Sequence, residues 1–203
     1  MKMKIEVERH HTERGEAQKQ RLVDAAYNII AELGFEGMHT RNVAASVGIS
    51  VSTFHFYFHS KDDLIQAVAR KLLHEFKMQL NPERRDGEGL NRLKDAVAAQ
   101  ADLIRKNPSG YIVVAEIFNR ALRDQKTRRV MQDILRTWER IFMASIIDGE
   151  GKSQLAEGSD PALSARAMHC LFWGMAMNQL MNARGYPSVA IFRQVKSWLS
   201  PKE

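Results

Sequence analysis

The chain has 203 residues, of which 44% are hydrophobic and 27% charged, proportions that are typical of a folded domain and exclude wholesale disorder. No stretch approaches the roughly 18 apolar residues of a membrane span, and the charged N-terminal segment lacks the apolar core of a signal peptide. The single cysteine, Cys170, excludes an intramolecular disulfide, so we expect a cytoplasmic protein without a membrane partner.

Charge is distributed unevenly along the chain. The formal net charge is +6, yet the first 80 residues carry 11 basic and 10 acidic side chains, so bulk charge does not identify them as a nucleic-acid binder. The local balance differs, because the stretch from Gly37 to Lys61 contains Arg41, Lys61 and no acidic residue.

The first predicted helix is amphipathic. Its apolar residues recur every three or four positions, which is the helical period. The stripe consists of Leu22, Ala25, Ala26, Ile29, Ile30 and Leu33. Gly34 follows, and its access to the left-handed backbone conformation predicts that the helix ends there.

Two short helices are predicted next, over residues 40–47 and 50–58. We expect Thr40 and Ser50 to be their N-caps, with small Ala44 where the helices cross and Gly48 at positive φ in the turn. The apolar residues expected beneath the pair are Val43, Val47, Ile49, Phe54 and Tyr57. Together these positions match the steric requirements of a helix-turn-helix, a motif that places its second helix in the DNA major groove.

The rest of the chain also follows a helical period. Capping residues and apolar spacing predict further helices over residues 60–80, 90–106, 108–122, 126–147, 161–183 and 188–199, with loops at 81–89 and 148–160. We therefore expect an all-α fold of about nine helices. It would comprise an N-terminal arm and helix-turn-helix domain over residues 1–62 and a helical ligand-binding and dimerisation domain over residues 63–203.

If the second short helix enters a major groove, its two faces have different roles. Phe54, Tyr57 and Phe58 would anchor it, while hydroxyl, imidazole and apolar side chains on the other face would address base edges or thymine methyl groups. Phosphates would be bound by Thr40, by Tyr57 and by the helix start at Ser60-Lys61, through hydroxyl, ammonium and backbone N–H groups.

The run LVDAAYNIIAELGFEGMHTRNVAASVGISVSTFHFYFHSKDDLIQAV, Leu22 to Val68, resembles the DNA-binding domain of TetR-family transcriptional regulators. The resemblance rests on the amphipathic helix, the Gly-Phe pair, the capping threonine, A-x-x-x-G-[IV]-S, the aromatic recognition helix and F-x-S-K. It implies a homodimeric repressor of transcription that a small molecule releases from a pseudo-palindromic operator. By position, the implied DNA contacts are Thr40, Arg41, Ser50, Val51, Ser52, His55, Phe56, Tyr57 and Lys61.

The recognition helix departs from the usual family pattern at two places. His55 stands where a DNA-contacting tyrosine is common, and Val51-Ser52 replaces a common Lys-Gly pair. The operator sequence therefore does not follow by analogy, and these positions are where we expect the DNA preference of this protein to reside.

The C-terminal part is expected to hold the effector and the dimer contact. The resemblance implies dimerisation through the last two helices, about residues 161–199. For the unknown effector, the predicted lining residues are Tyr111, Phe118, Met131, Trp138, Phe142, Trp173 and Met177. The competing interpretation is a plain core role for the first five and the dimer interface for Trp173 and Met177. The basic run from Arg120 to Arg140 is read as a solvated face, with an anionic ligand as the alternative.

Other classes of function are weighed against this one. His55 and His59 have a spacing that can bind a metal, but the helix is expected to end near Phe58, so we expect no metal and no cofactor. Cys170 is expected to be a small core residue. No common catalytic motif occurs, so we do not expect an enzyme. A structural DNA-binding protein without an effector remains the alternative function.

Overall fold

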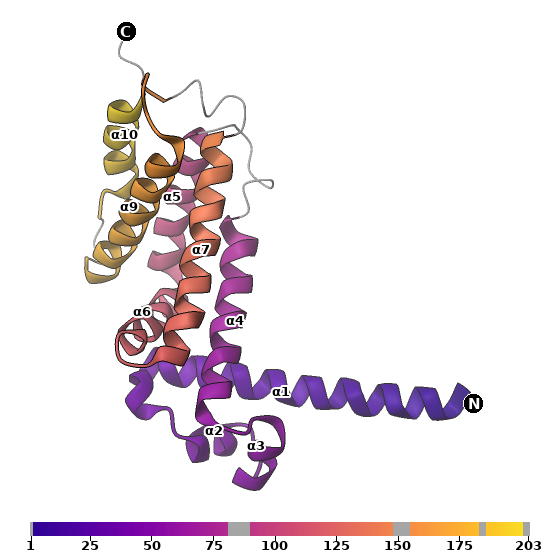
Figure 1. Cartoon of the computed structure of the whole chain (residues 1–203). Helices are drawn as coiled ribbons and strands as arrows, with labels where there is room; N and C mark the ends of the chain where they lie inside the picture. The colour runs from indigo at the N-terminus through magenta and orange to yellow at the C-terminus, as the bar shows by residue number, and fades with distance from the viewer. Residues whose placement is uncertain (1, 81–89, 148–154, 183–185, 201–203) are drawn as a thin grey trace. The chain divides into compact units, whose positions relative to one another are not determined.

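The computed structural model describes residues 2–80, 90–147, 155–182 and 186–200, and within these ranges it contains nine α-helices and no strand (Figure 1). The helices are α1 (Lys2–Gly37), α2 (Thr40–Ser46), α3 (Val51–Tyr57), α4 (Lys61–Leu80), α5 (Leu90–Lys106), α6 (Ser109–Ala121), α7 (Gln125–Ile147), α9 (Pro161–Met181) and α10 (Ser188–Leu199). The predicted all-α fold is confirmed. The expected loop at 81–89 and most of the one at 148–160 lie outside the described residues. None of the described helices is long and apolar enough to cross a membrane.

Helix boundaries follow the predicted caps closely. The Asp160 carboxylate accepts hydrogen bonds from the backbone N–H groups of Ala162 and Leu163 at the start of α9. The Ser60 hydroxyl accepts from the N–H of Asp63 at the start of α4. Such caps satisfy the N–H groups that lack a partner in the first turn, which is why these boundaries could be predicted locally. The α6 boundary differs slightly, since Pro108 precedes the helix.

The end of α1 differs from the prediction. Gly34 has positive φ as expected, but its φ of 65° and ψ of −172° are extended on the positive side, a conformation essentially restricted to glycine. The chain therefore kinks at Gly34, and helix α1 resumes up to Gly37. The buried stripe ends at Ile30, and Leu33, which we expected to be buried, is 62% exposed beside the kink.

The chain forms two compact units. The first comprises residues Met1–Leu72 and Val113–Val130, and the second comprises Leu73–Ile112 and Met131–Glu203. Helices α4, α6 and α7 each contribute to both units, so compact packing does not follow the order of the sequence. The domain boundary expected after residue 62 stays a prediction.

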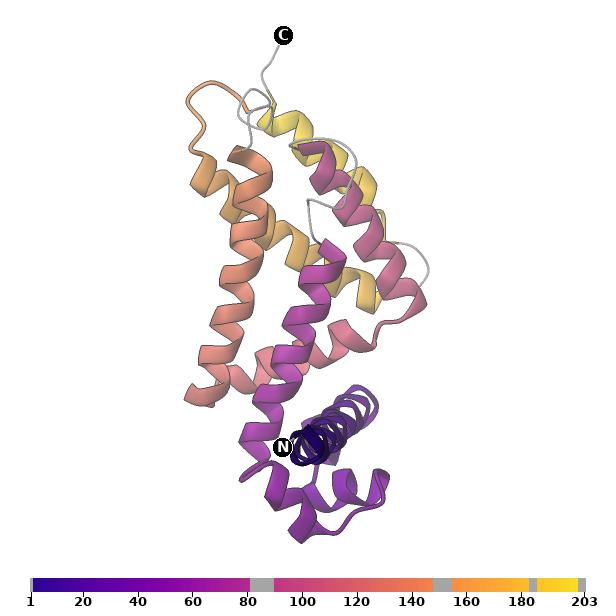
Figure 2. The same ribbon diagram turned by 90° about the vertical axis from the view of Figure 1, so that its right-hand side faces the viewer.

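The first unit joins the N-terminal helices to most of α6. Figure 2 looks along α1, with the short helices α2 and α3 packed in succession beside it. Fully buried residues from α1, α2, α3, α4 and α6 share its core: Leu22, Ala26, Ile30, Val43, Ala44, Phe54, Leu64, Val68, Leu72, Val113, Val114 and Ile117. Because one side of α3 is buried in this core, the orientation of the helix within the first unit is fixed and its other side faces solvent.

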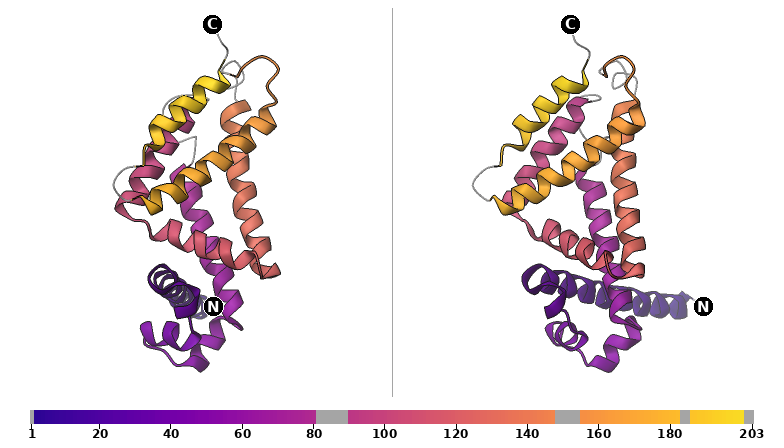
Figure 3. Two further views of the ribbon diagram at one scale, coloured as in Figure 1. Left: turned by 90° about the vertical axis from the view of Figure 1, so that its left-hand side faces the viewer. Right: turned by 60° about the vertical axis from the view of Figure 1, so that its left-hand side comes forward.

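The second unit contains α5, α9 and α10, together with parts of α4, α6 and α7. Helix α5 packs against both α9 and α10, and these three helices lie side by side in both views of Figure 3. Large rings dominate the interior, where Tyr111, Trp138, Phe172 and Phe192 are each 1% exposed. The core of this unit is therefore aromatic.

Candidate functional site

The turn between α2 and α3 has the predicted helix-turn-helix geometry. Gly48 has a φ of 74°, and an added Cβ would meet no atom within 4 Å, so the conformation, and not crowding, requires glycine there. The N–H groups of Gly48 and Ile49 donate to the carbonyls of Ala45 and Ala44, which closes α2. Ser50 then begins α3, as predicted, with its hydroxyl accepting from the Thr53 N–H at 3.1 Å.

The inner side of α3 is held by aromatic side chains. Phe54 is completely buried and Phe58 is 4% exposed, and their ring centroids lie 6.0 Å apart. Tyr57 is only half-buried, so it anchors the helix less than we expected. From α1, Arg21 donates to the carbonyl of Val47 at 3.2 Å, which attaches the end of α2 to the first helix.

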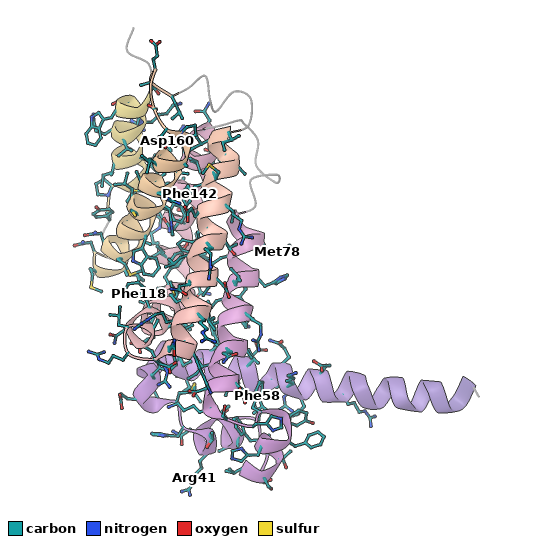
Figure 4. The ribbon with its side chains drawn as sticks, in the orientation of Figure 1. Arg41, Phe58, Met78, Phe118, Phe142 and Asp160 are labelled. Atoms are coloured by element: carbon teal, nitrogen blue, oxygen red, sulfur yellow. The ribbon has the colours of Figure 1, made fainter. Side chains whose placement is uncertain are left out.

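The outer side of α3 carries four of the predicted DNA-contacting residues together. Val51 is 38% and Phe56 80% exposed, and Ser52 and His55 are exposed beside them. We call these four residues the α3 outer face. It holds no acidic or basic side chain apart from the imidazole of His55. Arg41 on α2 is also exposed, and Figure 4 shows its side chain extending away from the helices of the first unit.

Two other predicted DNA contacts, Thr40 and Ser50, lie at the starts of α2 and α3. The N-cap position of α2 is occupied by His39, which makes no side-chain capping bond, and Thr40 is the first helical residue. The prediction of Thr40 as N-cap was therefore wrong by one residue, because the chain already leaves the extended conformation after His39. The Ser50 hydroxyl is engaged with the hydroxyls of Ser52 and Thr53 at 2.7 and 2.8 Å.

Lys61 belongs to a group of charged residues around Phe35, just after the kink in α1. Its ammonium group donates to the Phe35 carbonyl at 3.4 Å, and the Phe35 N–H donates to Glu116 Oε2 at 3.2 Å. Arg120 lies over the Phe35 ring at 5.5 Å and pairs with Asp62 at 3.0 Å. We call these five residues the Phe35 cluster, which joins α1, α4 and α6.

The electrostatics of the Phe35 cluster are balanced between opposite charges. Burial lowers the pKa of Lys61 and the positive charge of Arg120 lowers it further, while Glu36 and Asp62 oppose these effects. The sequence pattern predicts neither a role for Glu116 nor the pairing of Arg120 with Asp62. Their partners lie 81 and 58 residues away, a separation at which no sequence period indicates a contact.

The basic run from Arg120 to Arg140 is used largely within the protein. Besides the pairing of Arg120, the guanidinium of Arg128 donates to the carbonyls of Ala121 and Leu122 at 2.9 and 2.8 Å, capping the end of α6. Arg136 pairs with Asp133 one turn away in α7 at 3.2 Å. These contacts favour the interpretation of a structural and solvated face over a site for an anionic ligand.

In the second unit, rings from four helices form one continuous group. Trp138 lies 5.3–6.0 Å from the rings of its neighbours, in mostly edge-to-face geometry. The group, called here the Trp138 cluster, consists of Phe76, Tyr111, Trp138, Phe142, His169, Phe172 and Trp173.

The Trp138 cluster contains four of the seven residues predicted to line an effector site: Tyr111, Trp138, Phe142 and Trp173. Met131 is also buried in this unit and Met177 is half-buried there. Phe118 is different, because it belongs to the first unit and is 37% exposed. The additional members are Phe76, His169 and Phe172. For His169 and Phe172, the spacing of residues 169, 172 and 173 on one face of α9 is the signal that could have found them.

Several polar atoms buried in the second unit lack a hydrogen-bond partner among the described residues. They are Trp138 Nε1, Gln100 Nε2, Gln179 Oε1 and His169 Nε2. An unpaired buried polar group costs about 1–3 kcal/mol, so such a set needs an explanation. Burial lowers the pKa of His169, against a smaller raising effect of Glu139, and this favours the neutral imidazole.

The remaining chemistry of the described residues is sparse. Within them, no group of three or more His, Cys, Asp or Glu side chains could hold a metal ion. Cys170 is exposed, so the prediction of a core cysteine was wrong. The buried face of α9 passes through Met168, Phe172 and Met175, and residue 170 lies to one side of it.

Two family models match the chain, and together they cover most of it. Residues 22–68 match the model of bacterial regulatory proteins of the tetR family, and residues 90–200 match the C-terminal model of BetI-type transcriptional repressors. The second match alone covers more than half of the chain.

Individual relatives are distant but of similar length. The chain is 24% identical over 157 residues to the HTH-type transcriptional regulator UidR of Escherichia coli K12, covering 77% of this chain and 79% of UidR. The solved structure of GusR from Salmonella enterica has a TM-score of 0.74 at 21% identity, covering 90% and 94% of the two chains. A regulator from Saccharomonospora viridis, solved in complex with choline, has a TM-score of 0.73 at 20% identity, covering 90% and 94%.

The structural likeness supports the fold, and the family matches support the function. The N-terminal match coincides with the helix-turn-helix described above, and the C-terminal match includes the Trp138 cluster apart from Phe76. The chain therefore belongs to the TetR family of bacterial regulatory proteins and is a DNA-binding transcriptional regulator.

Proposed function

We propose that this protein is a homodimeric repressor that binds a pseudo-palindromic operator and leaves it when a small-molecule effector binds. The observation that carries the DNA-binding part is the α3 outer face, which is exposed and free of acidic residues while Phe54 and Phe58 hold the opposite side. In a two-fold dimer, two such helices would enter successive major grooves about 34–36 Å apart.

We propose that the dimer forms through α9 and α10, about residues 161–199. Large apolar side chains are exposed on both helices: Leu163 by 61%, Met181 by 81% and Trp198 by 68%. Apolar side chains of this size favour a protein interface over water, because their burial removes apolar surface from solvent. Helix α5 already covers another side of both helices.

We propose that the effector binds in the second unit. Trp138 Nε1, Gln100 Nε2 and Gln179 Oε1 are buried there without a hydrogen-bond partner in the described part of the chain, and a bound molecule could satisfy them. A ligand that binds more tightly to the state incompetent for DNA would shift the population toward that state. By linkage, the operator would weaken effector binding by the same factor. The proposed activity is binding in the cytoplasm, without catalysis.

DNA binding is tested by selecting genomic fragments with the purified full-length protein, followed by titration of the enriched site. We expect a palindromic site that is bound with nanomolar-range affinity and a strong dependence on salt. Arg41→Ala should lower affinity for all sequences and reduce the salt slope by about one. Arg140→Ala on α7 is the matched control, because it removes the same charge from an exposed position and should leave affinity unchanged.

Two results would contradict the proposal. Failure of the protein to enrich any sequence would exclude a specific operator. Equal losses in Arg41→Ala and Arg140→Ala would show that net charge matters and the helix-turn-helix does not.

The effector is sought with a small-molecule library, by thermal shift of the free protein and of the protein–operator complex. A true effector should raise the melting temperature of free protein and displace the operator. If no compound does both, the alternative of a structural DNA-binding protein without an effector is favoured.

A further inference from the structure

Among the side chains of the first unit that the structure describes, Phe56 is the most exposed large apolar one, at 80%. A phenylalanine left in water forgoes the stabilisation that its burial would supply, so its place on the α3 outer face calls for a partner. The fold itself does not need this ring. Phe54 and Phe58 anchor α3, and the ring contact that Phe56 makes among the described residues is with Tyr57, at 5.2 Å.

The neighbours of Phe56 limit what α3 can recognise. Discrimination of guanine in the major groove usually relies on an arginine or lysine that reaches its O6 and N7 atoms. No such residue lies on α3, and the ammonium group of Lys61 is engaged with the Phe35 carbonyl. Ser52, four residues before Phe56 and therefore on the same side of the helix, has its hydroxyl 2.7 Å from that of Ser50.

An exposed apolar side chain can still read one base in the major groove. Thymine is the base that presents a methyl group there, at C5, and apolar side chains recognise it by contact. Phe56 is the largest apolar group on the α3 outer face, and it lies on the side of the helix opposite the buried Phe54.

We propose that Phe56 is a specificity-determining residue that recognises the C5 methyl group of a thymine in each operator half-site. This inference rests on the proposed function, since it requires a specific operator. It adds the chemistry of the contact, which is apolar and directed at one methyl group.

The test uses the operator recovered by selection. Each thymine of the half-site is replaced in turn by deoxyuridine, which removes the methyl group and keeps the hydrogen-bonding edge of the base. For the wild-type protein, replacement of one particular thymine by deoxyuridine in one half-site should lower the affinity for the operator about four-fold, which is the effect expected for one buried methyl group. Replacement of the other thymines should have little effect. Substitution in both half-sites of the palindrome together should lower affinity about fifteen-fold.

Protein variants show which side chain is responsible for the difference in affinity between the thymine and deoxyuridine operators. Phe56→Ala should bind the thymine and deoxyuridine operators equally, and Phe56→Leu should retain part of the difference. His55→Ala, a neighbouring exposed substitution, should keep the full difference at that position. Because both side chains are exposed, these variants should unfold at nearly the wild-type temperature, which thermal denaturation checks.

Different results would contradict this inference and the proposed function on which it rests. The inference is overturned if wild-type protein tolerates deoxyuridine at every position, if the half-site lacks thymine, or if Phe56→Ala keeps the wild-type difference. Absence of any enriched operator would instead overturn the proposed function and this inference with it.

Discussion

The Phe35 cluster and the Trp138 cluster stabilise their units by different means. Around Phe35, single polar contacts join α1, α4 and α6: a bond to a backbone N–H, a bond to a carbonyl and an ion pair. Around Trp138, contact between rings extends over four helices, and five of the seven rings are buried while His169 and Trp173 are half-buried. Directional contacts of the first kind contribute about 1 kcal/mol each and weaken with salt. Buried rings contribute several times more and are insensitive to salt.

Removal of the central ring should have the largest effect. Trp138→Ala should lower the free energy of unfolding by about 3–5 kcal/mol, because it deletes a side chain that is 1% exposed and contacts four other rings. Urea denaturation provides the measurement. Trp138→Phe is the matched control, since it keeps a ring and removes the unpaired N–H, and it should cost much less. Equal losses in the two variants would show that ring packing is not what stabilises this cluster.

The kink beside Phe35 should be the next most sensitive position. Gly34→Ala should cost about 1–3 kcal/mol, because φ 65° with ψ −172° is strained for any residue with a Cβ. The added Cβ would also lie 3.3 Å from Glu116 Oε2, the atom that accepts from the Phe35 N–H. Calorimetric melting compares this variant with Gly15→Ala, which has open space around its Cβ. A variant as stable as the wild type would mean that the kink is not required.

The ion pair of the Phe35 cluster should have a smaller and salt-dependent effect. A double-mutant cycle with Arg120→Met and Asp62→Asn should give a coupling of about 0.5–1 kcal/mol, because both side chains are about one-third exposed. The coupling should fall when denaturation is repeated in about 1 M salt, where screening acts over roughly 3 Å. A coupling that salt leaves unchanged would contradict the assignment of this contact as electrostatic.

The smallest effect concerns the pH dependence of the second unit. Burial lowers the pKa of His169, so the unfolded chain binds its proton first as the pH falls. The contribution of the neutral imidazole is therefore complete above the unfolded pKa of about 6.5 and declines as the pH falls toward the lower pKa of the folded state.

His169→Gln should accordingly show a smaller loss of melting temperature between pH 7.5 and 5.5 than the wild type. His74→Gln, which changes an exposed histidine of the same unit, is the control and should leave the loss unchanged. If His169→Gln has the same pH dependence as the wild type, another group is responsible for it.

The two clusters also differ in how far the sequence predicted them. In α9, residues 169, 172 and 173 share one helical face, and this spacing of large rings indicates an interior. Four members of the Trp138 cluster are among the residues that we predict to line an effector site. In the Phe35 cluster, Arg120 was assigned to a solvated basic run. A charged side chain gives the same pattern whether it lies in solvent or pairs with a residue 58 positions away.

Local chemistry determined most of the secondary structure and the DNA-binding motif. Ser50 and Asp160 cap helices in the structure, Gly48 has positive φ, and Phe54 is buried, because each depends on residues within one or two turns. From these the sequence by itself identified an all-α TetR-family regulator.

Tertiary structure alone decided which distant groups meet. Glu116 and Arg120 contact Phe35, next to the kink at Gly34. Leu33 and Cys170 are exposed, and Trp138 Nε1 is buried without a partner among the described residues. The physical reason is that such contacts depend on where whole helices cross. A side chain's neighbours across a helix crossing are set by the packing of both helices, which its own sequence period does not contain.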